Sequence, residues 1–171
     1  MRLFIAVNFD DEVKNHIQRI QDELRKEATG NFSRRENFHL TLAFLGEQGE
    51  DEADMVKRIM QTLTVKPMTL VFTKTGCFKR PQGDVWWLGL EKNEQLFSLQ
   101  QELADKLRRF SFDLEDRPYS PHITLARKVR LRPQSKPPLL KEKFSATTEH
   151  VSLMLSHRVD GKLTYTEIFR V

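Results

Sequence analysis

The sequence contains one short pattern twice, and this repeat constrains the fold more than any other feature. Residues 39–43 read His-Leu-Thr-Leu-Ala, and residues 122–126 read His-Ile-Thr-Leu-Ala. Because residues i and i+2 of a β-strand share a face, each copy presents an imidazole and a hydroxyl on one side and aliphatic side chains on the other. His39 and His122 lie 83 positions apart in a chain of 171 residues. The repeat therefore predicts two related strands in two similar halves.

The rest of the pattern fits such a chain. We predict an α+β fold in which residues 1–171 form a single bilobal domain. Its two similar, pseudo-duplicated lobes of antiparallel sheet and helices surround a central cleft, and each lobe contributes one His-x-Thr strand. Apolar stripes predict helices from 11 to about 28, over 51–63 and over 93–110. Apolar runs and alternation predict strands over 2–8, 38–45, 68–72, 84–90, 122–129, 151–156 and 163–171. Asp160-Gly161 predicts a tight turn between the last two strands.

The repeated side chains suit acid–base chemistry at a phosphate. The unperturbed pKa of histidine, about 6.5, lets an imidazole accept and release protons near neutral pH. Two imidazoles in one cleft divide a displacement between them: one takes a proton from the attacking oxygen and the other gives one to the leaving oxygen. A hydroxyl two residues further on binds a phosphate oxygen. We therefore expect His39 and His122 to be catalytic, and Thr41 and Thr124 to bind phosphate.

Two other interpretations compete with this one. A single His-x-Thr in a strand is most often structural, but four matching residue types at the same offsets are hard to explain by packing alone. His16, His150 and His157 have no such context. Two histidines and a carboxylate would suit zinc or non-haem iron. However, neither motif contains a carboxylate or a second closely spaced histidine, so we expect no metal and no cofactor.

Four stretches of the chain resemble the 2H phosphoesterase superfamily, and within it the RNA 2′,3′-cyclic phosphodiesterase branch, whose members are also called 2′-5′ RNA ligases. These stretches are Arg2–Ala6, Glu36–Gly46, Trp87–Leu90 and Pro121–Arg127. They run through most of the chain. The resemblance implies a bilobal fold with both motifs in one cleft. It also implies metal-independent hydrolysis of a 2′,3′-cyclic phosphate to a 2′-phosphate.

The resemblance also implies roles for individual residues. His39 and His122 match the acid–base pair of the family, and we assign His39 as the acid and His122 as the base by analogy. The residues themselves do not distinguish these roles. Arg127 matches an arginine of the family motif and is a candidate for phosphate binding. In a regular strand, however, Arg127 would point away from His122 and Thr124, so it reaches the cleft only past a bulge, at the strand end or through its backbone.

Further candidates concern RNA. Residues 127–143 hold seven Lys or Arg and a single Glu, which is typical of a polyanion-binding segment. Phe78, Trp87 and Arg130 are candidate RNA contacts, because aromatic rings stack on bases and cations bind phosphates. Trp86 shares strand parity with Leu88 and is assigned to the core, whereas Trp87 shares it with Gly89, which leaves room for a ligand.

The expected partner is RNA that ends in a 2′,3′-cyclic phosphate, such as tRNA fragments. The chain has a single cysteine and no apolar run long enough to span a membrane, so we expect a cytoplasmic monomer without membrane contact. Two alternatives stay open: a module that binds RNA ends without turnover, and a phosphodiesterase of small cyclic nucleotides.

Overall fold

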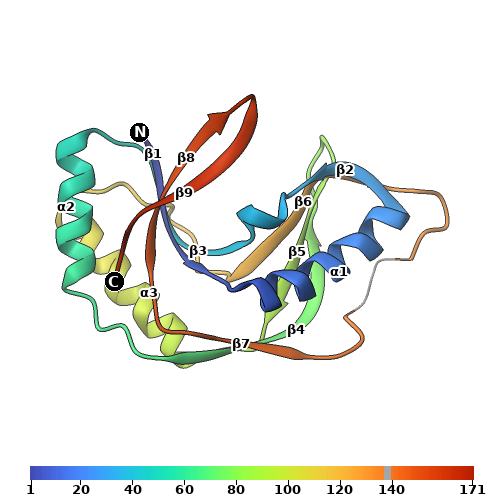
Figure 1. Cartoon of the computed structure of the whole chain (residues 1–171), viewed down its shortest axis with the longest axis horizontal. Helices are drawn as coiled ribbons and strands as arrows, with labels where there is room; N and C mark the ends of the chain where they lie inside the picture. Colours follow the sequence, from blue (N-terminus) through green and yellow to red (C-terminus); the bar gives the residue numbers. More distant parts are fainter. Residues whose placement is uncertain (137–139) are drawn as a thin grey trace.

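The chain folds into two antiparallel β-sheets, seen side by side in a computed structural model that describes residues 1–136 and 140–171 (Figure 1). The first sheet contains, in spatial order, β3 (His39–Glu47), β1 (Arg2–Asn8), β8 (Ser152–Val159) and β9 (Lys162–Arg170). The second contains β2 (Ala28–Phe32), β6 (His122–Leu131), β5 (Asp84–Leu90), β4 (Met68–Phe78) and β7 (Phe144–Thr148). The two motif strands, β3 and β6, belong to different sheets and contact each other.

Three helices cover the sheets. They are α1 (Asp11–Glu27), α2 (Glu50–Gln61) and α3 (Glu94–Arg109), and a short 3₁₀ helix, η1 (Arg35–Asn37), precedes β3. Helix α1 packs on β2 and β6, whereas α3 packs on β3 and α2. The Asp10 side chain caps α1 by accepting a hydrogen bond from the Val13 amide, and Asn93 caps α3 in the same way. The helices therefore begin where the sequence supplies a capping residue.

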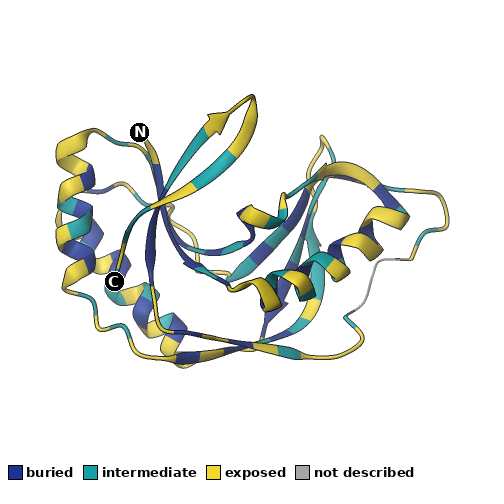
Figure 2. Cartoon of the chain, viewed as in Figure 1, coloured by how far each residue is buried: buried dark blue, intermediate teal, exposed yellow. Residues whose placement is uncertain are grey.

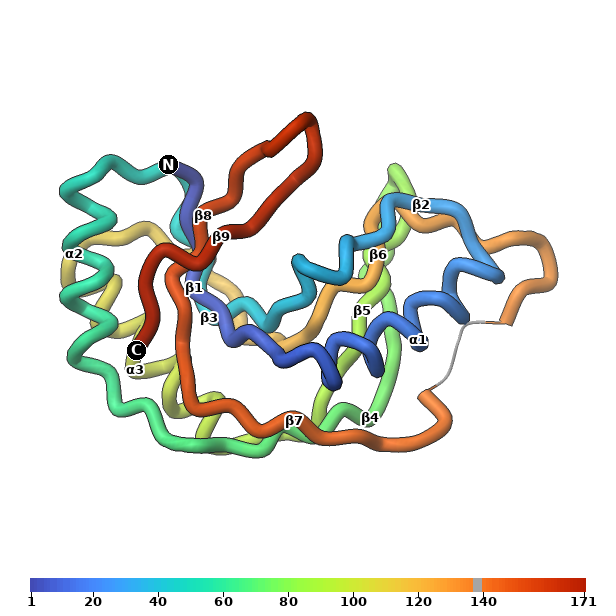
Figure 3. Tube along the Cα trace, viewed as in Figure 1, coloured from blue at the N-terminus to red at the C-terminus, as the bar shows by residue number. Residues whose placement is uncertain are grey.

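The lobes are interleaved along the chain and are not consecutive halves. Figure 3 shows the chain leaving the first sheet after β1 for α1 and β2, then returning for η1 and β3. It crosses again to β4 and β5, and α3 lies between β5 and β6 in sequence although it packs on the other lobe. Each lobe therefore uses strands from both ends of the sequence, which ties the lobes together covalently at several points.

Buried side chains form one continuous apolar cluster that includes residues of both sheets and all three helices. Figure 2 shows this burial along β1, β3 and β6 and on the inner faces of the helices, while the tip of the β8–β9 hairpin is exposed. A small second cluster of Phe4, Ala6 and Met154 lies on the opposite face of the first sheet, with Tyr165 packed against it. The motif strands are thus anchored in the core on one face only.

The predicted α+β class with two similar lobes is confirmed. The sequence-based strand assignment was incomplete, because β2 and β7 are two strands that it did not contain and β4 extends six residues beyond its expected end. The predicted turn is present, with φ of 50° at Asp160 and 75° at Gly161. Within the described residues, no helix is long and apolar enough to cross a membrane.

Candidate active site

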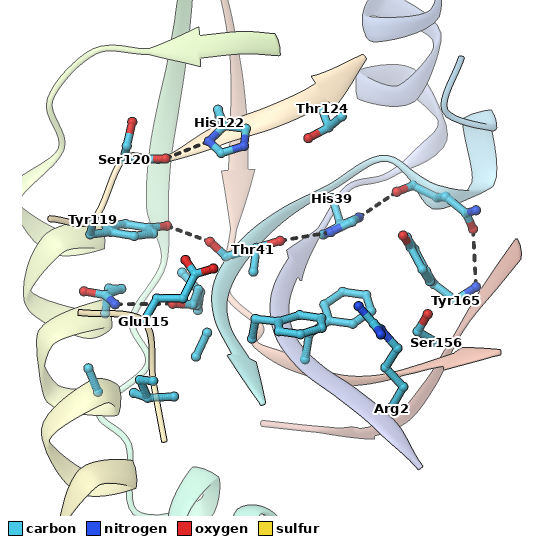
Figure 4. A pocket seen from close by; sticks show the side chains of 18 of the residues that line it. Arg2, His39, Thr41, Glu115, Tyr119, Ser120, His122, Thr124, Ser156 and Tyr165 are labelled. Atoms are coloured by element: carbon cyan, nitrogen blue, oxygen red, sulfur yellow. Dashed lines mark hydrogen bonds between the residues drawn. The ribbon is translucent and has the colours of Figure 1, made fainter. Parts of the chain in front are cut away.

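The four repeated side chains line one cleft of about 1950 Å³. His39 and Thr41 come from β3 of the first sheet, and His122 and Thr124 come from β6 of the second (Figure 4). Because the two strands belong to different lobes, the cleft is built equally from both. The structure therefore brings together the residues that the sequence repeat singled out.

The tautomer of His39 is fixed by its neighbours. Its Nδ1 lies 2.7 Å from the backbone carbonyl of Asn37, and a carbonyl only accepts, so Nδ1 carries the hydrogen. In the neutral ring Nε2 is then an acceptor, and the Thr41 hydroxyl donates to it at 3.0 Å. When the ring is protonated, the same contact reverses and Nε2 donates. His39 is thus held at both nitrogens.

His122 has the same arrangement at one nitrogen and differs at the other. Its Nδ1–H donates to the backbone carbonyl of Ser120 at 2.7 Å, again two residues before the histidine. In the described part of the chain, no residue hydrogen-bonds Nε2 of His122, and the structure records no bond between it and Thr124. The two copies therefore present equivalent imidazoles, but only His39 has its reactive nitrogen engaged by its own threonine.

Aromatic rings fix the plane of each imidazole. The ring centroids of Phe4 and Tyr165 lie 4.8 Å and 5.2 Å from that of His39. On the other side Phe78 lies edge-on at 5.2 Å from His122, and Trp87 at 6.4 Å. Such packing limits rotation about χ2 and leaves Nε2 as the nitrogen that faces the cleft in each case.

Burial and charge set the protonation of both histidines. Desolvation lowers the pKa of His39, its hydrogen bond to the Asn37 carbonyl opposes this, and the nearby Arg127 and His122 lower it further. Desolvation also lowers the pKa of His122, partly offset by the Ser120 carbonyl and reinforced by Arg127. Both imidazoles are therefore neutral at a lower pH than a histidine in water, and Arg127 is close enough to act on both.

A β-bulge in the second motif explains how Arg127 reaches the cleft. Trp86 and Trp87 on β5 pair with Ala126 and Thr124, so Leu125 is an extra residue in β6. Leu125 and Ala126 are both buried, and the alternation resumes with Arg127 on the cleft side. In a regular strand Arg127 would point away from His122 and Thr124. The bulge reverses this and brings Arg127 to the cleft side.

The first motif has a bulge at the matching position. Ile5 and Ala6 on β1 pair with Ala43 and Thr41, which leaves Leu42 as the extra residue. As in β6, two buried residues in succession follow the threonine, and Phe44 then lines the cleft in the place that Arg127 has in the other lobe. The local geometry repeats along with the sequence, but the side chain at this position does not.

The backbone carbonyl of each bulge leucine is bonded by a glutamine from the covering helix. Gln21 of α1 is fully buried, and its amide donates to the Leu125 carbonyl at 2.8 Å and to the Ser33 carbonyl at 2.7 Å. Gln100 of α3 donates to the Leu42 carbonyl at 3.3 Å. The helices thus hold the irregular part of each motif strand in place.

Two further side chains, Tyr119 and Asn37, connect the segments around the motifs, and neither was among the predicted site residues. The Tyr119 hydroxyl donates to the backbone carbonyl of Thr41 at 3.0 Å, which joins the segment before the second motif to the first motif. The Asn37 side chain donates to the Leu163 carbonyl at 2.9 Å and accepts from the Tyr165 amide at 3.3 Å. The only sequence signal for either is its place two or three residues before a motif histidine.

The remaining candidates are placed unevenly. Phe78 lines the cleft, whereas Trp87 and Arg130 are not among the residues that line it. The Trp87 ring lies against Gly76 and Gly89, where an added Cβ would come within 2.5 Å and 2.8 Å of it. The space beside Gly89 that was expected for a ligand is therefore filled by this ring. Trp86 is buried in the core, as expected.

The basic segment contributes little to the cleft. Of its seven cations only Arg127 and Lys128 line it. Within residues 1–136 and 140–171, no group of three or more His, Cys, Asp or Glu side chains is arranged to hold a metal ion. The two imidazoles, the two threonine hydroxyls and the Arg127 guanidinium are the candidate groups for chemistry in this cleft.

Comparison with known proteins agrees with this geometry. Residues 9–160 match the model of the 2′-5′ RNA ligase superfamily. An RNA 2′,3′-cyclic phosphodiesterase of Archaeoglobus fulgidus is 31% identical over 135 residues, which are 78% of this chain and 76% of the relative. An enzyme of the same name from Thermotoga maritima is 35% identical over 131 residues, 74% of this chain and 70% of its own. These names support the expectation of a hydrolase.

Solved structures extend the similarity to the whole fold. Escherichia coli LigT in complex with 3′-AMP superposes with a TM-score of 0.84 at 27% identity, covering 99% of this chain and 96% of that one. Sequence, fold and the two motifs thus point the same way, and the chain belongs to the 2′-5′ RNA ligase superfamily.

Proposed function

We propose that the protein hydrolyses the 2′,3′-cyclic phosphate at the end of an RNA to a 2′-phosphate. The observation that carries the proposal is the shared tautomer of His39 and His122. In each ring Nδ1 is engaged by a carbonyl and Nε2 is left as the proton-exchanging nitrogen in one cleft. The names of the relatives supply the substrate class.

The proposed reaction needs two proton transfers. Nε2 of neutral His122 takes a proton from water as the water oxygen bonds to phosphorus. The bond between phosphorus and the ribose 3′ oxygen breaks, and protonated His39 gives its Nε2 proton to that oxygen. The product holds a 2′-phosphate and a 3′-hydroxyl, and the two histidines have exchanged protonation states. Solvent then restores the starting states.

Other side chains bind the phosphate. In this proposal the Thr41 and Thr124 hydroxyls, which line the cleft, donate to its non-bridging oxygens, and the Arg127 guanidinium supplies the positive charge. When His39 gives up its proton, the Thr41 hydroxyl becomes the donor to Nε2, so the neutral ring keeps a partner. The proposal assigns no role to a metal or a cofactor, because the histidines and Arg127 account for proton transfer and charge.

The test compares two histidines of the same cleft. His122→Ala is expected to lower the hydrolysis of a cyclic-phosphate-ended oligonucleotide by about 10²- to 10⁴-fold at unchanged thermal stability. His157→Ala is the matched control, because His157 lines the cleft but bonds Thr166. Full activity of His122→Ala would refute the mechanism, and loss of activity in EDTA would favour metal chemistry.

Two alternatives have their own outcomes in this assay. Binding of the oligonucleotide without product would indicate an RNA-end-binding module, and turnover of nucleoside cyclic phosphates alone would indicate a small-molecule phosphodiesterase. The biological setting that we propose is a cytoplasmic monomer acting on RNA such as tRNA fragments, in keeping with the single free cysteine, Cys77.

A further inference from the structure

Charge is distributed unevenly around the cleft. The side formed by β2, the segment before η1, β6 and the β8–β9 hairpin carries four cations and no acidic residue. We call this group the cationic wall: Arg34, Arg127, Lys128 and Arg158. Among the described residues, the side formed by the end of β3, by α3 and by the segment after α3 carries the four acidic residues that line the cleft, Glu47, Glu102, Asp105 and Glu115, together with two cations, Arg108 and Arg117. The net formal charge is therefore positive on the first side and negative on the second, which favours a polyanion on the first side.

The cationic wall is continuous with the candidate active site. The Ser33 hydroxyl donates to the Thr124 carbonyl at 2.9 Å, which places the neighbouring Arg34 beside the second motif. Arg34 in turn donates to the Leu163 carbonyl at 3.2 Å. Leu163 pairs with Arg158 across the β8–β9 hairpin. A chain of direct contacts thus leads from the phosphate-binding threonine to the hairpin.

Lys128 belongs to the β6 part of the cationic wall, in the other sheet from Arg158, and has an unusual backbone conformation. It follows Arg127 in β6, has a φ of 52°, and its backbone packs against Gly83. Arg127, Lys128 and Arg158 are exposed. Figure 1 shows the tip of the β8–β9 hairpin apart from the ends of β2 and β6, and residues of all these strands line the cleft. The cationic wall therefore draws its cations from both lobes.

The cleft is larger than one nucleotide requires. Pockets for single small ligands measure roughly 300–1,000 Å³, whereas this cleft measures about 1950 Å³. The space beyond the two motifs is bordered by positive charge on one side, and phosphodiesters carry one negative charge per nucleotide. The size and the charge together fit several linked nucleotides.

We infer that the cationic wall is a binding track for the phosphodiester backbone of single-stranded RNA upstream of the reacting end. The chain leaves the active site between the β8–β9 hairpin and the ends of β2 and β6, and the α3 side stays free of RNA. The inference rests on the proposed function for the identity of the reacting end. With such a track, the protein prefers an oligonucleotide substrate to a mononucleotide.

The test removes two charges of the wall that take no part in binding the reacting phosphate. Lys128→Gln/Arg158→Gln is compared with Arg132→Gln/Lys141→Gln, which removes two cations of the basic segment outside the cleft. Each variant is assayed on a nucleoside 2′,3′-cyclic phosphate and on a single-stranded oligonucleotide with the same end. Binding of a fluorescent oligonucleotide is measured over a range of salt concentrations.

The expected result is specific to the long substrate. The wall variant raises KM for the oligonucleotide about tenfold at low salt and reduces the slope of log K against log salt by about 1.4, as for two lost phosphate contacts. Turnover of the mononucleotide and all properties of the control variant are unchanged. Equal effects on both substrates, or equal effects of both variants, would overturn the track.

The binding measurement separates this inference from the proposed function. If the wild-type protein turns over neither substrate, the proposed function fails, and the salt-dependent binding still shows whether the wall holds RNA. If the wild-type protein is active and the wall variant binds and reacts as the wild type does, the track fails while the proposed function remains.

Discussion

The buried amide of Gln21 donates a 2.8 Å hydrogen bond to the backbone carbonyl of Leu125, the bulge residue of the second motif. The same carbonyl accepts a hydrogen bond from the Ser33 backbone amide at 2.9 Å, and Gln21 also donates to the Ser33 carbonyl, so the glutamine joins α1 to both chain segments at the bulge. The same bulge turns Arg127 toward the cleft. Gln21, 106 positions before Arg127 in the sequence, therefore bonds the part of β6 that sets the direction of this cation. Gln100 serves Leu42 in the other lobe.

Replacing this glutamine tests its contribution. Gln21→Met keeps the side-chain volume and removes both donated bonds, so the free energy of unfolding should fall by about 1–3 kcal/mol in urea denaturation. Gln100→Met is the symmetry-matched control and should cost less, because its longer bond lies in a partly buried place. Equal stability of Gln21→Met and the wild type would contradict this account.

Tyr119 is expected to fix the separation of the two motifs. Tyr119→Phe removes the hydrogen bond to the Thr41 carbonyl, which should cost about 1 kcal/mol of stability. Because small displacements of reacting groups are costly, kcat should fall by roughly ten- to a hundredfold with little change in KM. Phe97→Leu is the control, since Phe97 packs on the Tyr119 ring and leaves the hydroxyl in place. A similar loss of kcat in both variants would indicate packing alone.

The pH profile should report the lowered pKa of both histidines. In the free enzyme kcat/KM rises as the base loses its proton and falls as the acid loses its own. Desolvation and Arg127 lower the pKa of both, so we expect a maximum below about pH 6.5. A cation disfavours a protonated imidazole, so Arg127→Gln should move both limbs to higher pH. Lys128→Gln should leave them in place, and an unshifted Arg127→Gln profile would remove Arg127 from the site electrostatics.

The assignment of acid and base is tested through the leaving group. In a cyclic substrate with sulfur in place of the 3′ oxygen, the leaving group is a thiolate, which needs no proton from an acid. His39→Ala should therefore lose far less activity on the sulfur substrate than on the oxygen substrate, while His122→Ala should be impaired on both by about 10²-fold or more. The opposite pattern would exchange the roles of the two histidines.

Much of this architecture is readable from the sequence because it depends on local periodicity. The three helices follow from apolar stripes and from caps such as Asp10 and Asn93. Strand β2 was missed because Thr29-Gly30-Asn31 has no apolar alternation and lies at the edge of its sheet. The first helix, predicted to about residue 28, ends at Glu27, and β2 follows it directly. The interleaving of the lobes depends on long-range strand pairing, which periodicity does not encode.

For the candidate site, too, the local pattern was readable from the sequence and the long-range contacts were not. The four repeated side chains were identified because the repeat is in the sequence itself, and the structure places them in one cleft. The position of Arg127 depends on a bulge, and the Gln21 amide that bonds the bulge carbonyl is far away along the chain. The cationic wall combines Arg127 and Lys128 of the basic segment with Arg34 and Arg158 from separate elements, which no single stretch of the sequence brings together.

The paired bulges at Leu42 and Leu125 bring side chains of different chemistry to matching positions of the two half-sites. Five residues after each histidine, the chain presents Phe44 in one lobe and Arg127 in the other. Phe44 carries the Arg2 guanidinium 4.9 Å above its ring, while Arg127 acts on both imidazoles. Arg127 thus makes the two related half-sites electrostatically different. This position, in either lobe, is where a duplicated scaffold would change to break a different ester bond.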